Sequence, residues 1–331
     1  MTPGRLPAVS GLVDRAMDFT VLPGFSRIGY GLRRRMFEWQ PPELSGRSVM
    51  VTGASSGLGE AAAIDLARCG AKVHMVCRNE ERGERARARV NAEAATAGTD
   101  REPVLHLCDL SLVSSIREFA SGFLASETPL DVVINNAGVM PSEREQTEEG
   151  FELTFATNVI GPYLLTELLL PRLREGKDPR VIVMSSGGMY SSGFSLGDPQ
   201  LDRRDYRPTG FYAHTKRAEV MMADAWQRRE PPGGVTFCSM HPGWAVTPGM
   251  SAALPGFHRV TGPILRDARE GADTAVWLAG ATADEAPGGL FYEDRRPRAK
   301  ERIPGTAGSR EDGDRLLELL AGITSSVDVE G

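Results

Sequence analysis

Cysteine, histidine and aromatic residues are scarce in this chain. Its 331 residues include four cysteines and five histidines, and Phe, Trp and Tyr together make up 7%. Cys69, Cys77, Cys108 and Cys238 show neither paired nor metal-ligand spacing, which argues against a disulfide framework or a structural metal site. We therefore predict no metal centre. Because Cys77 and Cys108 end apolar runs, we expect them to be buried free thiols in a reducing cytosol.

An excess of positive charge and long apolar segments are absent as well. The formal net charge is -6, whereas a general nucleic-acid binder carries a strongly basic domain. No stretch has the 18 consecutive apolar residues that span a bilayer, and the first residues lack the pattern of a signal peptide. We expect a cytoplasmic protein without a transmembrane segment or a nucleic-acid partner. The basic clusters Arg33 to Arg35, Arg203 to Arg204 and Arg295 to Arg296 are interpreted as solvated surface.

Short β-rich apolar runs alternate with longer helical stretches, which is typical of βαβ units around a parallel sheet. We expect strands at Ser48 to Thr52, Lys72 to Cys77, Val104 to Cys108, Asp131 to Asn135, Arg180 to Ser185, Val235 to Met240 and Gly289 to Tyr292. We expect helices at Leu58 to Cys69, Glu80 to Ala95, Ser114 to Ser126, Glu149 to Arg174 (two in series), Tyr212 to Arg229 and Gly271 to Leu278. The predicted fold class is α/β, a single-domain Rossmann-type doubly wound parallel sheet of about seven strands with helices on both faces.

Three regions fall outside this alternation. We predict an N-terminal arm at residues 1–44, a central α/β domain at residues 45–294 and a C-terminal tail at residues 295–331. Asp18 to Trp39 combines apolar and basic residues, which fits either packing on the core or peripheral contact with a membrane surface. Met189 to Thr209 is expected to be a long functional loop. In the tail, only Arg315 to Leu320 is periodic enough to predict order.

A glycine-rich turn, Val51 to Gly59, follows the first expected strand and opens a helix. Gly53, Gly57 and Gly59 allow a tight turn and a close approach to a pyrophosphate, for which the helix N-terminus offers free N–H groups. The spacing is G-x-x-x-G-x-G. The turn therefore predicts a dinucleotide site, to which Ser55, Ser56 and Leu58 also belong.

The end of the second strand distinguishes NADP from NAD. NAD-binding folds place an acidic residue there, on the ribose 2′-hydroxyl, and NADP-binding folds supply arginine. Here Cys77 is followed by Arg78 and Asn79, and a guanidinium suits a 2′-phosphate. We expect a preference for NADP(H), with NAD(H) as the alternative. Arg78 could instead be a surface cation that pairs with Glu80 or Glu81.

Tyr212 and Lys216 stand four positions apart, so in a helix they share one face. A phenol is a weak acid–base catalyst at neutral pH, and a fixed positive charge beside it favours the phenolate. Together with the glycine turn, the pair predicts an enzyme that interconverts a carbonyl and an alcohol. Alone, it would fit an ordinary half-exposed helix face. His214 points to another face of the helix and is expected at the surface. His241, next to Pro242, is expected to be structural.

The order of these motifs resembles that of the short-chain dehydrogenase/reductase family, over roughly Ser48 to Tyr292. The matching glycine turn, Tyr-x-x-x-Lys pair and further motifs are highly specific when taken jointly. One subgroup of the family also has an arm before the first strand. Its sequences around the positions of Ser186, Tyr212 and Pro242 are similar to those of this chain. The further residues that match the family are Asp109 and Leu110, Asn136, Ala137 and Gly138, Asn158, Ser186, and Pro242, Gly243 and Thr247.

The resemblance implies a role for each matching residue. Tyr212 would act as general acid, Ser186 would hydrogen-bond the carbonyl oxygen, and Lys216 would act on both Tyr212 and the nicotinamide ribose. Asn158 would position a water. The remaining matching residues would contact the cofactor. Ser186 precedes Tyr212 by 26 positions (212 minus 186), more than in many family members, so the intervening residues must loop out, and Ser185 is the alternative serine. The resemblance also makes a homo-oligomer an open expectation.

The function predicted is NADP(H)-dependent interconversion of a carbonyl and an alcohol on a lipophilic small molecule. Apolar residues in Thr247 to Arg269 favour such a substrate, or else they pack a lid onto the core. One alternative is a catalytically silent NADP(H)-binding scaffold or redox-sensing regulator, but such a protein typically loses the tyrosine or the lysine. A sugar-nucleotide epimerase or dehydratase would need a larger substrate domain after Tyr292.

Overall fold

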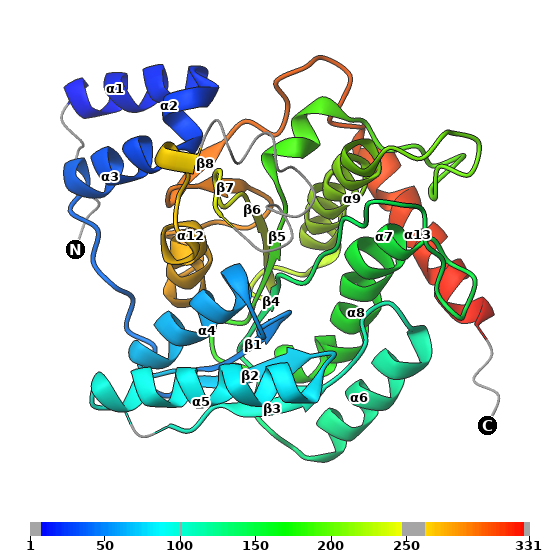
Figure 1. Cartoon of the computed structure of the whole chain (residues 1–331), viewed down its shortest axis with the longest axis horizontal. Coiled ribbons are helices and arrows are strands. Elements are labelled where there is room, and N and C mark those ends of the chain that lie inside the picture. Colours follow the sequence, from blue (N-terminus) through cyan, green and yellow to red (C-terminus); the bar gives the residue numbers. More distant parts are fainter. Residues whose placement is uncertain (1–7, 100, 247–261, 328–331) are drawn as a thin grey trace.

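One twisted sheet runs through the centre of the molecule, with helices on both of its faces (Figure 1). The computed structural model describes residues 8–99, 101–246 and 262–327. The strands are β1 Ser48–Thr52, β2 Lys72–Cys77, β3 Val104–Leu107, β4 Val132–Asn135, β5 Arg180–Met184, β6 Thr236–Met240, β7 Phe291–Glu293 and β8 Arg296–Arg298. Their order is β3-β2-β1-β4-β5-β6-β7-β8. Because β1 lies between β2 and β4, the direction of strand addition reverses there, and open α/β sheets bind ligands at such a point.

The predicted α/β fold with a doubly wound parallel sheet is confirmed. All seven predicted strands occur, pair in parallel and start or end within two residues of the expected positions. The eighth strand, β8, was not expected, and it pairs antiparallel with β7. Asp294 and Arg295 form the turn between them with φ of 53° and 56°, the left-handed backbone that a two-residue hairpin turn needs. Neither residue is a glycine, which concealed the turn from sequence reasoning.

Two helical layers cover the sheet. On one face lie α4 Gly57–Arg68, α5 Glu80–Thr96 and α12 Ala268–Gly280. On the other lie α6 Val113–Ala125, α8 Gly161–Leu173 and α9 Pro208–Arg229, with α13 Arg310–Ser326 packed on α9. The short helices are α7 Leu153–Phe155, the π-helix η1 Ala156–Ile160, and the 3₁₀ helices η2 Gly187–Ser191 and η3 Gly262–Ile264. Since Pro208 suits the first position of a helix, α9 begins four residues before the expected start.

The core follows from the alternation of side chains along buried strands. In β1, Val49 and Val51 point into the core under α4, while Met50 points into the core under α8. All five residues of β1 are buried. A strand that is apolar on both faces is stable only between two covering layers, which is the reason why the doubly wound arrangement forms.

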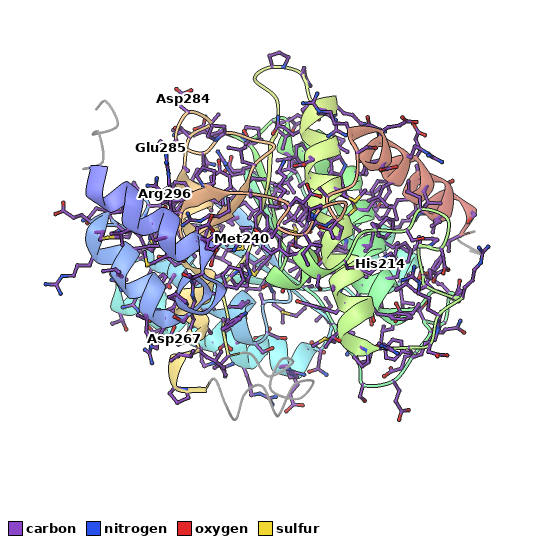
Figure 2. The ribbon with its side chains drawn as sticks, turned by 90° about the horizontal axis from the view of Figure 1, so that it is seen from above. His214, Met240, Asp267, Asp284, Glu285 and Arg296 are labelled. Atoms are coloured by element: carbon purple, nitrogen blue, oxygen red, sulfur yellow. The ribbon has the colours of Figure 1, made fainter. Side chains whose placement is uncertain are left out.

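The N-terminal helices α1 Ala8–Phe19, α2 Val21–Phe25 and α3 Arg27–Met36 pack against the β7–β8 end of the sheet. Figure 2 shows α1 and α3 together at one end of the molecule, with Arg296 of β8 beside them. The interpretation of Arg33 as solvated surface is wrong. Its guanidinium is buried and contacts Asp14 at 2.8 Å and Asp294 at 2.5 Å, because a buried cation needs such partners. Its neighbours Arg34 and Arg35 are exposed. The same interpretation is wrong for Arg295, whose side chain is 10% exposed and pairs with Asp273 at 2.7 Å.

The region after residue 294 contributes both β8 and α13. Three leucines of α13, Leu316, Leu317 and Leu320, are buried in the same core cluster as Met221 and Trp226 of α9. Ser309 and Asp312 form a capping box at the start of α13. The helix is much longer than the predicted periodic run. The division into an arm, a domain and a tail at residues 44 and 294 remains a prediction.

One helical stretch among the described residues, Leu153–Leu173, is long and apolar enough to cross a membrane by length and composition. Within the molecule 83% of that stretch is buried. It comprises α7, η1 and α8, and α8 packs beside α6 on the same face of the sheet. A core helix passes the same test of length and composition as a membrane span.

Candidate active site

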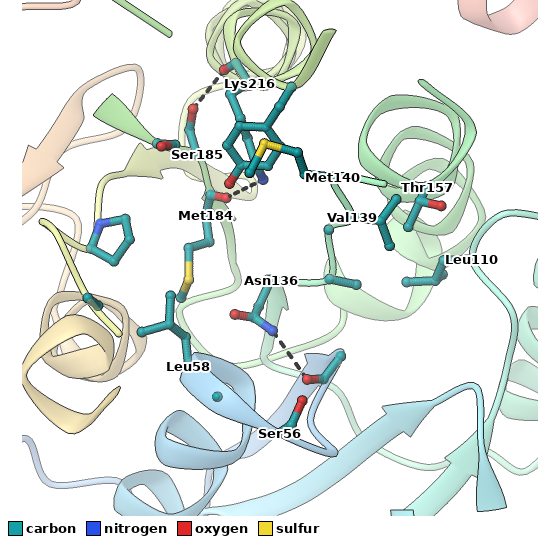
Figure 3. Close-up of a pocket in the computed structure, with 18 of the residues that line it drawn as sticks. Ser56, Leu58, Leu110, Asn136, Val139, Met140, Thr157, Met184, Ser185 and Lys216 are labelled. Atoms are coloured by element: carbon teal, nitrogen blue, oxygen red, sulfur yellow. Dashed lines mark hydrogen bonds between the residues drawn. The ribbon is translucent and has the colours of Figure 1, made fainter. Parts of the chain in front are cut away.

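A cavity of about 610 Å³ opens at the carboxyl ends of the central strands. Figure 3 shows its wall, with Ser56 and Leu58 from the glycine turn and α4 on one side and Met184, Ser185 and Lys216 on the other. The cavity therefore spans the point where the strand order reverses. It brings together the glycine turn and the Tyr212 helix, which are more than a hundred residues apart in the sequence.

The glycine turn has the backbone that its sequence requires. Gly53 and Gly57 adopt φ of 66° and 58°, which residues with a side chain rarely adopt. Gly59 faces a different constraint: a Cβ there would lie 2.4 Å from Gly53 O and 2.4 Å from Asn136 Nδ2. Asn136 in turn donates from Nδ2 to the carbonyl of Thr52 at 2.7 Å and to that of Gly53 at 3.4 Å (Figure 3). The turn, the end of β1 and the end of β4 are thus held together at the start of α4.

Arginine side chains flank the cavity at the end of β2. Arg78 is largely exposed, and its Nε lies 3.8 Å from the carboxylate of Asp109. Arg82, in the first turn of α5, lines the same cavity. Asn79 caps α5 by accepting from Arg82 N at 2.9 Å. The cavity therefore has two cations at this end, a combination suited to phosphate groups.

Ser185 and Ser186 follow β5 and have different partners. The Ser185 hydroxyl donates to the backbone carbonyl of Lys216 at 2.7 Å and is buried. Ser186 caps η2 by accepting from Gly188 N at 3.2 Å. Both serines line the cavity. Because the Ser185 hydroxyl is occupied by α9, Ser186 is the serine whose hydroxyl is placed to serve a ligand.

Lys216 is buried beneath the ring of Tyr212. Its Nζ lies 5.4 Å from the centroid of that ring and donates to Met184 O at 3.0 Å. It also donates to Glu219 Oε1 at 2.7 Å. Burial lowers the pKa of Lys216, but the attraction of Glu219 and Tyr212 outweighs burial and raises it. Burial raises the pKa of Glu219 to about 7 although Lys216 and Ser185 pull it down. Lys216 is thus held as a cation at the cavity wall.

Asn158 lies in the π-helix η1, behind the cavity wall. Its Oδ1 accepts from Val139 N at 2.8 Å, and its Nδ2 donates to Val139 O at 3.1 Å and to Thr215 Oγ1 at 3.0 Å. Single-turn π-helices are frequent at functional sites. Asn158 therefore joins the chain after β4 to α9 one residue from Lys216.

Comparisons with known proteins agree with this geometry. A family model described as short chain dehydrogenase matches residues 47–197. The chain is 43% identical over 281 residues to dehydrogenase/reductase SDR family member 12 of Bos taurus, which covers 84% of this chain and 86% of that protein. The chain belongs to the short-chain dehydrogenase/reductase family. Retinol dehydrogenase 12 of Bos taurus is 36% identical over 266 residues, covering 78% of this chain and 82% of that protein. A solved structure of an uncharacterised Mycobacterium paratuberculosis protein aligns with a TM-score of 0.69 and 30% identity, covering 86% of this chain and 96% of that one.

The family resemblance found in the sequence is therefore confirmed. The subgroup with similar motif sequences is that of dehydrogenase/reductase SDR family member 12. Membership makes the protein an NAD(P)-dependent oxidoreductase. The structure gathers most of the residues that match the family around one cavity. Those that line it are Gly53, Ser55, Ser56, Gly57, Leu58, Arg78, Asp109, Leu110, Asn136, Ala137, Gly138, Ser186, Tyr212, Lys216, Pro242 and Gly243. Gly59 and Asn158 stand behind its wall, and Thr247 lies outside the described residues.

The predictions for the two histidines beside the family motifs differ in their outcome. The expectation that His214 lies at the surface is wrong. His214 is buried, contacts Gly193 O and Pro199 O, and stacks on Phe194 with ring centroids 4.4 Å apart, because the loop before α9 folds back over it. His241 is buried as expected, and its Nδ1 accepts from Gly187 N at 3.0 Å.

Three residues near the family site were missed by sequence reasoning. Arg82 follows Arg78 by four positions, a helical spacing that could have identified it. Glu219 follows Lys216 by three positions on the same helix face, and a carboxylate beside a lysine is a detectable signal. Trp244, which follows Gly243 in the expected Pro-Gly motif, also lines the cavity. Nothing in its position within that motif indicated a role in the site.

Proposed function

We propose that this family member is an NADP(H)-dependent enzyme that interconverts a carbonyl and an alcohol on a lipophilic small molecule. The observation that carries the proposal is one cavity that contains the glycine turn, Ser186, Tyr212 and Lys216. A nucleotide turn alone fits many activities. A phenol over a buried ammonium fits proton transfer to or from a substrate oxygen.

The residues of the cavity fit a dinucleotide. The start of α4 at Gly57 offers backbone N–H groups to a pyrophosphate, and the volume is in the range of small-molecule sites. At the β2 end, Arg78 and Arg82 are suited to phosphate groups, and Asp109 is suited to the adenosine. At the opposite end, Lys216 is suited to the ribose hydroxyls next to the nicotinamide.

The dinucleotide supplies or takes up the hydride, and the chain has to manage the proton. In reduction, Tyr212 gives its phenolic proton to the substrate oxygen, and Ser186 donates a hydrogen bond to the same oxygen. Lys216 stabilises the phenolate that Tyr212 leaves behind. Asn158, which is hydrogen-bonded to the segment after β4, keeps α9 in register with that segment. Oxidation uses the same groups in the reverse order.

A preference for NADP(H) is supported by the sequence at the end of β2. Cys77 is the last residue of the strand, and Arg78 follows with no acid at the position that would contact a 2′-hydroxyl. The carboxylate of Asp109 lies 3.8 Å from Arg78 Nε. A 2′-phosphate would place a charge close to −2 beside the solvent-exposed guanidinium of Arg78. NAD(H) would leave this guanidinium without that partner.

A lipophilic substrate is supported by the apolar part of the wall. Val139, Met140, Met184 and Trp244 are among the apolar residues that line the cavity. Retinol dehydrogenase 12, a relative at 36% identity, is named for an apolar alcohol. Methionine side chains adapt to varied apolar shapes. We therefore propose an aldehyde, ketone or alcohol with a substantial hydrocarbon part.

We also propose that the arm makes peripheral contact with an anionic membrane surface, on the outer face of α3. Ile28 is 61% and Leu32 42% exposed on that face, and Arg34 and Arg35 beside them are exposed as well. Cytoplasmic localisation and a homo-oligomer also stay proposals. Because α13 packs on α9, a dimer interface that includes α9 could use only the part of this helix that α13 leaves uncovered.

The decisive experiment is a panel of carbonyl and alcohol substrates followed by NADPH absorbance, with wild type and Tyr212→Phe compared. We expect turnover of apolar aldehydes or ketones, and a loss of at least about 100-fold in Tyr212→Phe, since general acid–base groups contribute roughly 10² to 10⁴. NADPH affinity should change far less. Tyr163→Phe, on the buried face of α8 away from the cavity, is the matched control. Tight NADPH binding without turnover of any member of the panel would favour the silent scaffold.

A further inference from the structure

Glu219 is a buried acid in contact with Lys216. Its side chain is 2% exposed, and that of Lys216 is 3% exposed. Taking a carboxylate out of water is strongly unfavourable unless partners compensate. A position that only packs α9 against the sheet would be filled more stably by an apolar side chain of similar size. The acid therefore marks a role that uses its charge.

The geometry connects this charge to the cavity through one atom. Lys216 Nζ has three protons, and two of them are used by Met184 O and Glu219 Oε1. The third proton is left for the cavity side, where a Cβ on Gly138 would lie 3.3 Å from Nζ. Glu219 thus fixes the position and the direction of the ammonium at the place where the proposed cofactor ribose and Tyr212 meet.

The charged group that faces Glu219 is Lys216, from its own helix, and the Ser185 hydroxyl faces it from the end of β5. Tyr212 acts on Lys216 from one turn earlier on α9. A negative charge on Glu219 offsets part of the positive charge that Lys216 presents to the phenol of Tyr212. When Glu219 is protonated, the phenol faces the full charge of the lysine.

We propose that Glu219 is a positioning residue, which anchors Lys216 and sets by its own charge how strongly the lysine favours the phenolate of Tyr212. This inference rests on the proposed function of the site and deepens it. A burial-raised pKa of about 7 for Glu219 puts its change of charge within the working pH range. The acid would make the balance between oxidation and reduction depend on pH around neutrality.

Glu219→Gln separates charge from contact, because the amide oxygen can still accept from Lys216. We expect the rise of alcohol oxidation with pH, and the fall of carbonyl reduction, to move toward acid by about one unit, the lower end of the effect of a neighbouring charge. The KM for NADPH should stay within about threefold of wild type. Glu219→Ala should show the same shift and also lose at least about tenfold in kcat, because Lys216 loses an anchor.

The matched control is Glu167→Gln. Glu167 accepts from Trp226 Nε1 at 2.6 Å, between α8 and α9, and is remote from Lys216 in the hydrogen-bond network. This variant should keep the wild-type pH profile. A purely structural role for Glu219 predicts instead that both of its variants lower the melting temperature and kcat with an unchanged profile, and that result would overturn the proposal.

A second readout does not need turnover. NADPH affinity, measured by ligand fluorescence from pH 5.5 to 8.5, should weaken above pH 7 in wild type more than in Glu219→Gln, because the ionised acid opposes the charge that Lys216 offers an anionic ligand. Wild type and variant share the titration of the cofactor phosphate, so that contribution cancels. Identical affinity profiles would reject the role of Glu219 even in a protein without turnover. Absence of turnover with different affinity profiles would reject the proposed reaction alone.

Discussion

Phe25 of α2 lies edge-on against His241, with ring centroids 4.5 Å apart and planes at 80°. The carbonyl of Phe25 also accepts from Trp244 N at 2.8 Å. Arg266 completes the link by donating to Gly24 O at 3.0 Å and to Pro242 O at 3.3 Å. The N-terminal helices therefore support the wall of the cavity formed by the segment after β6.

Replacing Phe25 with alanine should disturb the cavity as well as the stability of the fold. Phe25 is 4% exposed, and truncating a buried phenylalanine costs about 3 to 5 kcal/mol. We expect that loss in denaturant unfolding, together with a several-fold weaker NADPH affinity. Phe19→Ala is the control, because Phe19 is 89% exposed. Loss of stability without any change in NADPH affinity would mean that the arm does not shape the site.

Arg78→Ala should reduce the preference for the phosphorylated cofactor. Removing the guanidinium should weaken NADPH binding by roughly tenfold or more and NADH binding by much less, because hydrogen bonds to charged groups contribute about 1.5 to 3 kcal/mol. Titration of both cofactors measures the ratio. Arg85→Ala, in the second turn of α5, removes an exposed arginine that pairs with Glu81 and should leave the ratio unchanged. Equal losses for the two cofactors would refute the assignment of Arg78.

A methyl group at Gly59 should be poorly tolerated. It would approach backbone and side-chain atoms at 2.4 Å, so the turn and Asn136 would have to separate. We expect Gly59→Ala to lower the melting temperature and to abolish measurable NADPH binding. Gly122→Ala in α6 is the opposite case, because no atom of the described residues lies within 4 Å of a Cβ there, and it should stabilise by about 0.4 to 1 kcal/mol. A Gly59→Ala protein that binds cofactor normally would contradict the assigned packing.

The stability of the protein should fall in mild acid because of His74. Burial, with the nearby His106 and Lys72, lowers the pKa of His74 to about 4. The unfolded chain therefore binds this proton first, below about pH 6.5, and its binding favours unfolding. The stabilisation is complete above pH 6.5 and is lost as the pH falls toward 4. Between pH 6.5 and 5 the loss should be about 2 kcal/mol.

His74→Gln provides the comparison for that prediction. The variant cannot take up the proton, so its free energy of unfolding should fall less steeply over the same interval in urea titrations. His106 keeps its own titration in both proteins, since burial lowers its pKa as well. Parallel curves for wild type and variant would exclude His74 as the source.

Much of the fold could be predicted because its signals are local. The apolar runs of β1 and β4, the glycines of the turn, and the spacing of Tyr212 and Lys216 each carry their physical reason within a few residues. Their order along the chain then indicated the family. The strands met these expectations to within two residues, since an apolar run between turn residues has few alternatives in a parallel sheet.

What could not be predicted depends on contacts between distant segments. Arg33 is buried because Asp14 and Asp294 converge on it, and nothing near Arg33 in the sequence announces Asp294. His214 is covered by a loop whose path the sequence leaves open. The proposed role of Glu219 could not be predicted for the same reason. Its spacing from Lys216 is visible in the sequence, but its burial at the end of β5 is not.

The packing of α13 on α9 gives the molecule a vulnerable point far from the cavity. A protease cut between Gly305 and Arg310 would release three buried leucines from the flank of the helix that carries Tyr212. Met221 and Trp226 of α9 would then add to an exposed apolar surface, to which chaperones and other cleaved molecules can bind. The protein would then lose activity through a cut far from the cavity, although every group in the cavity remains chemically intact.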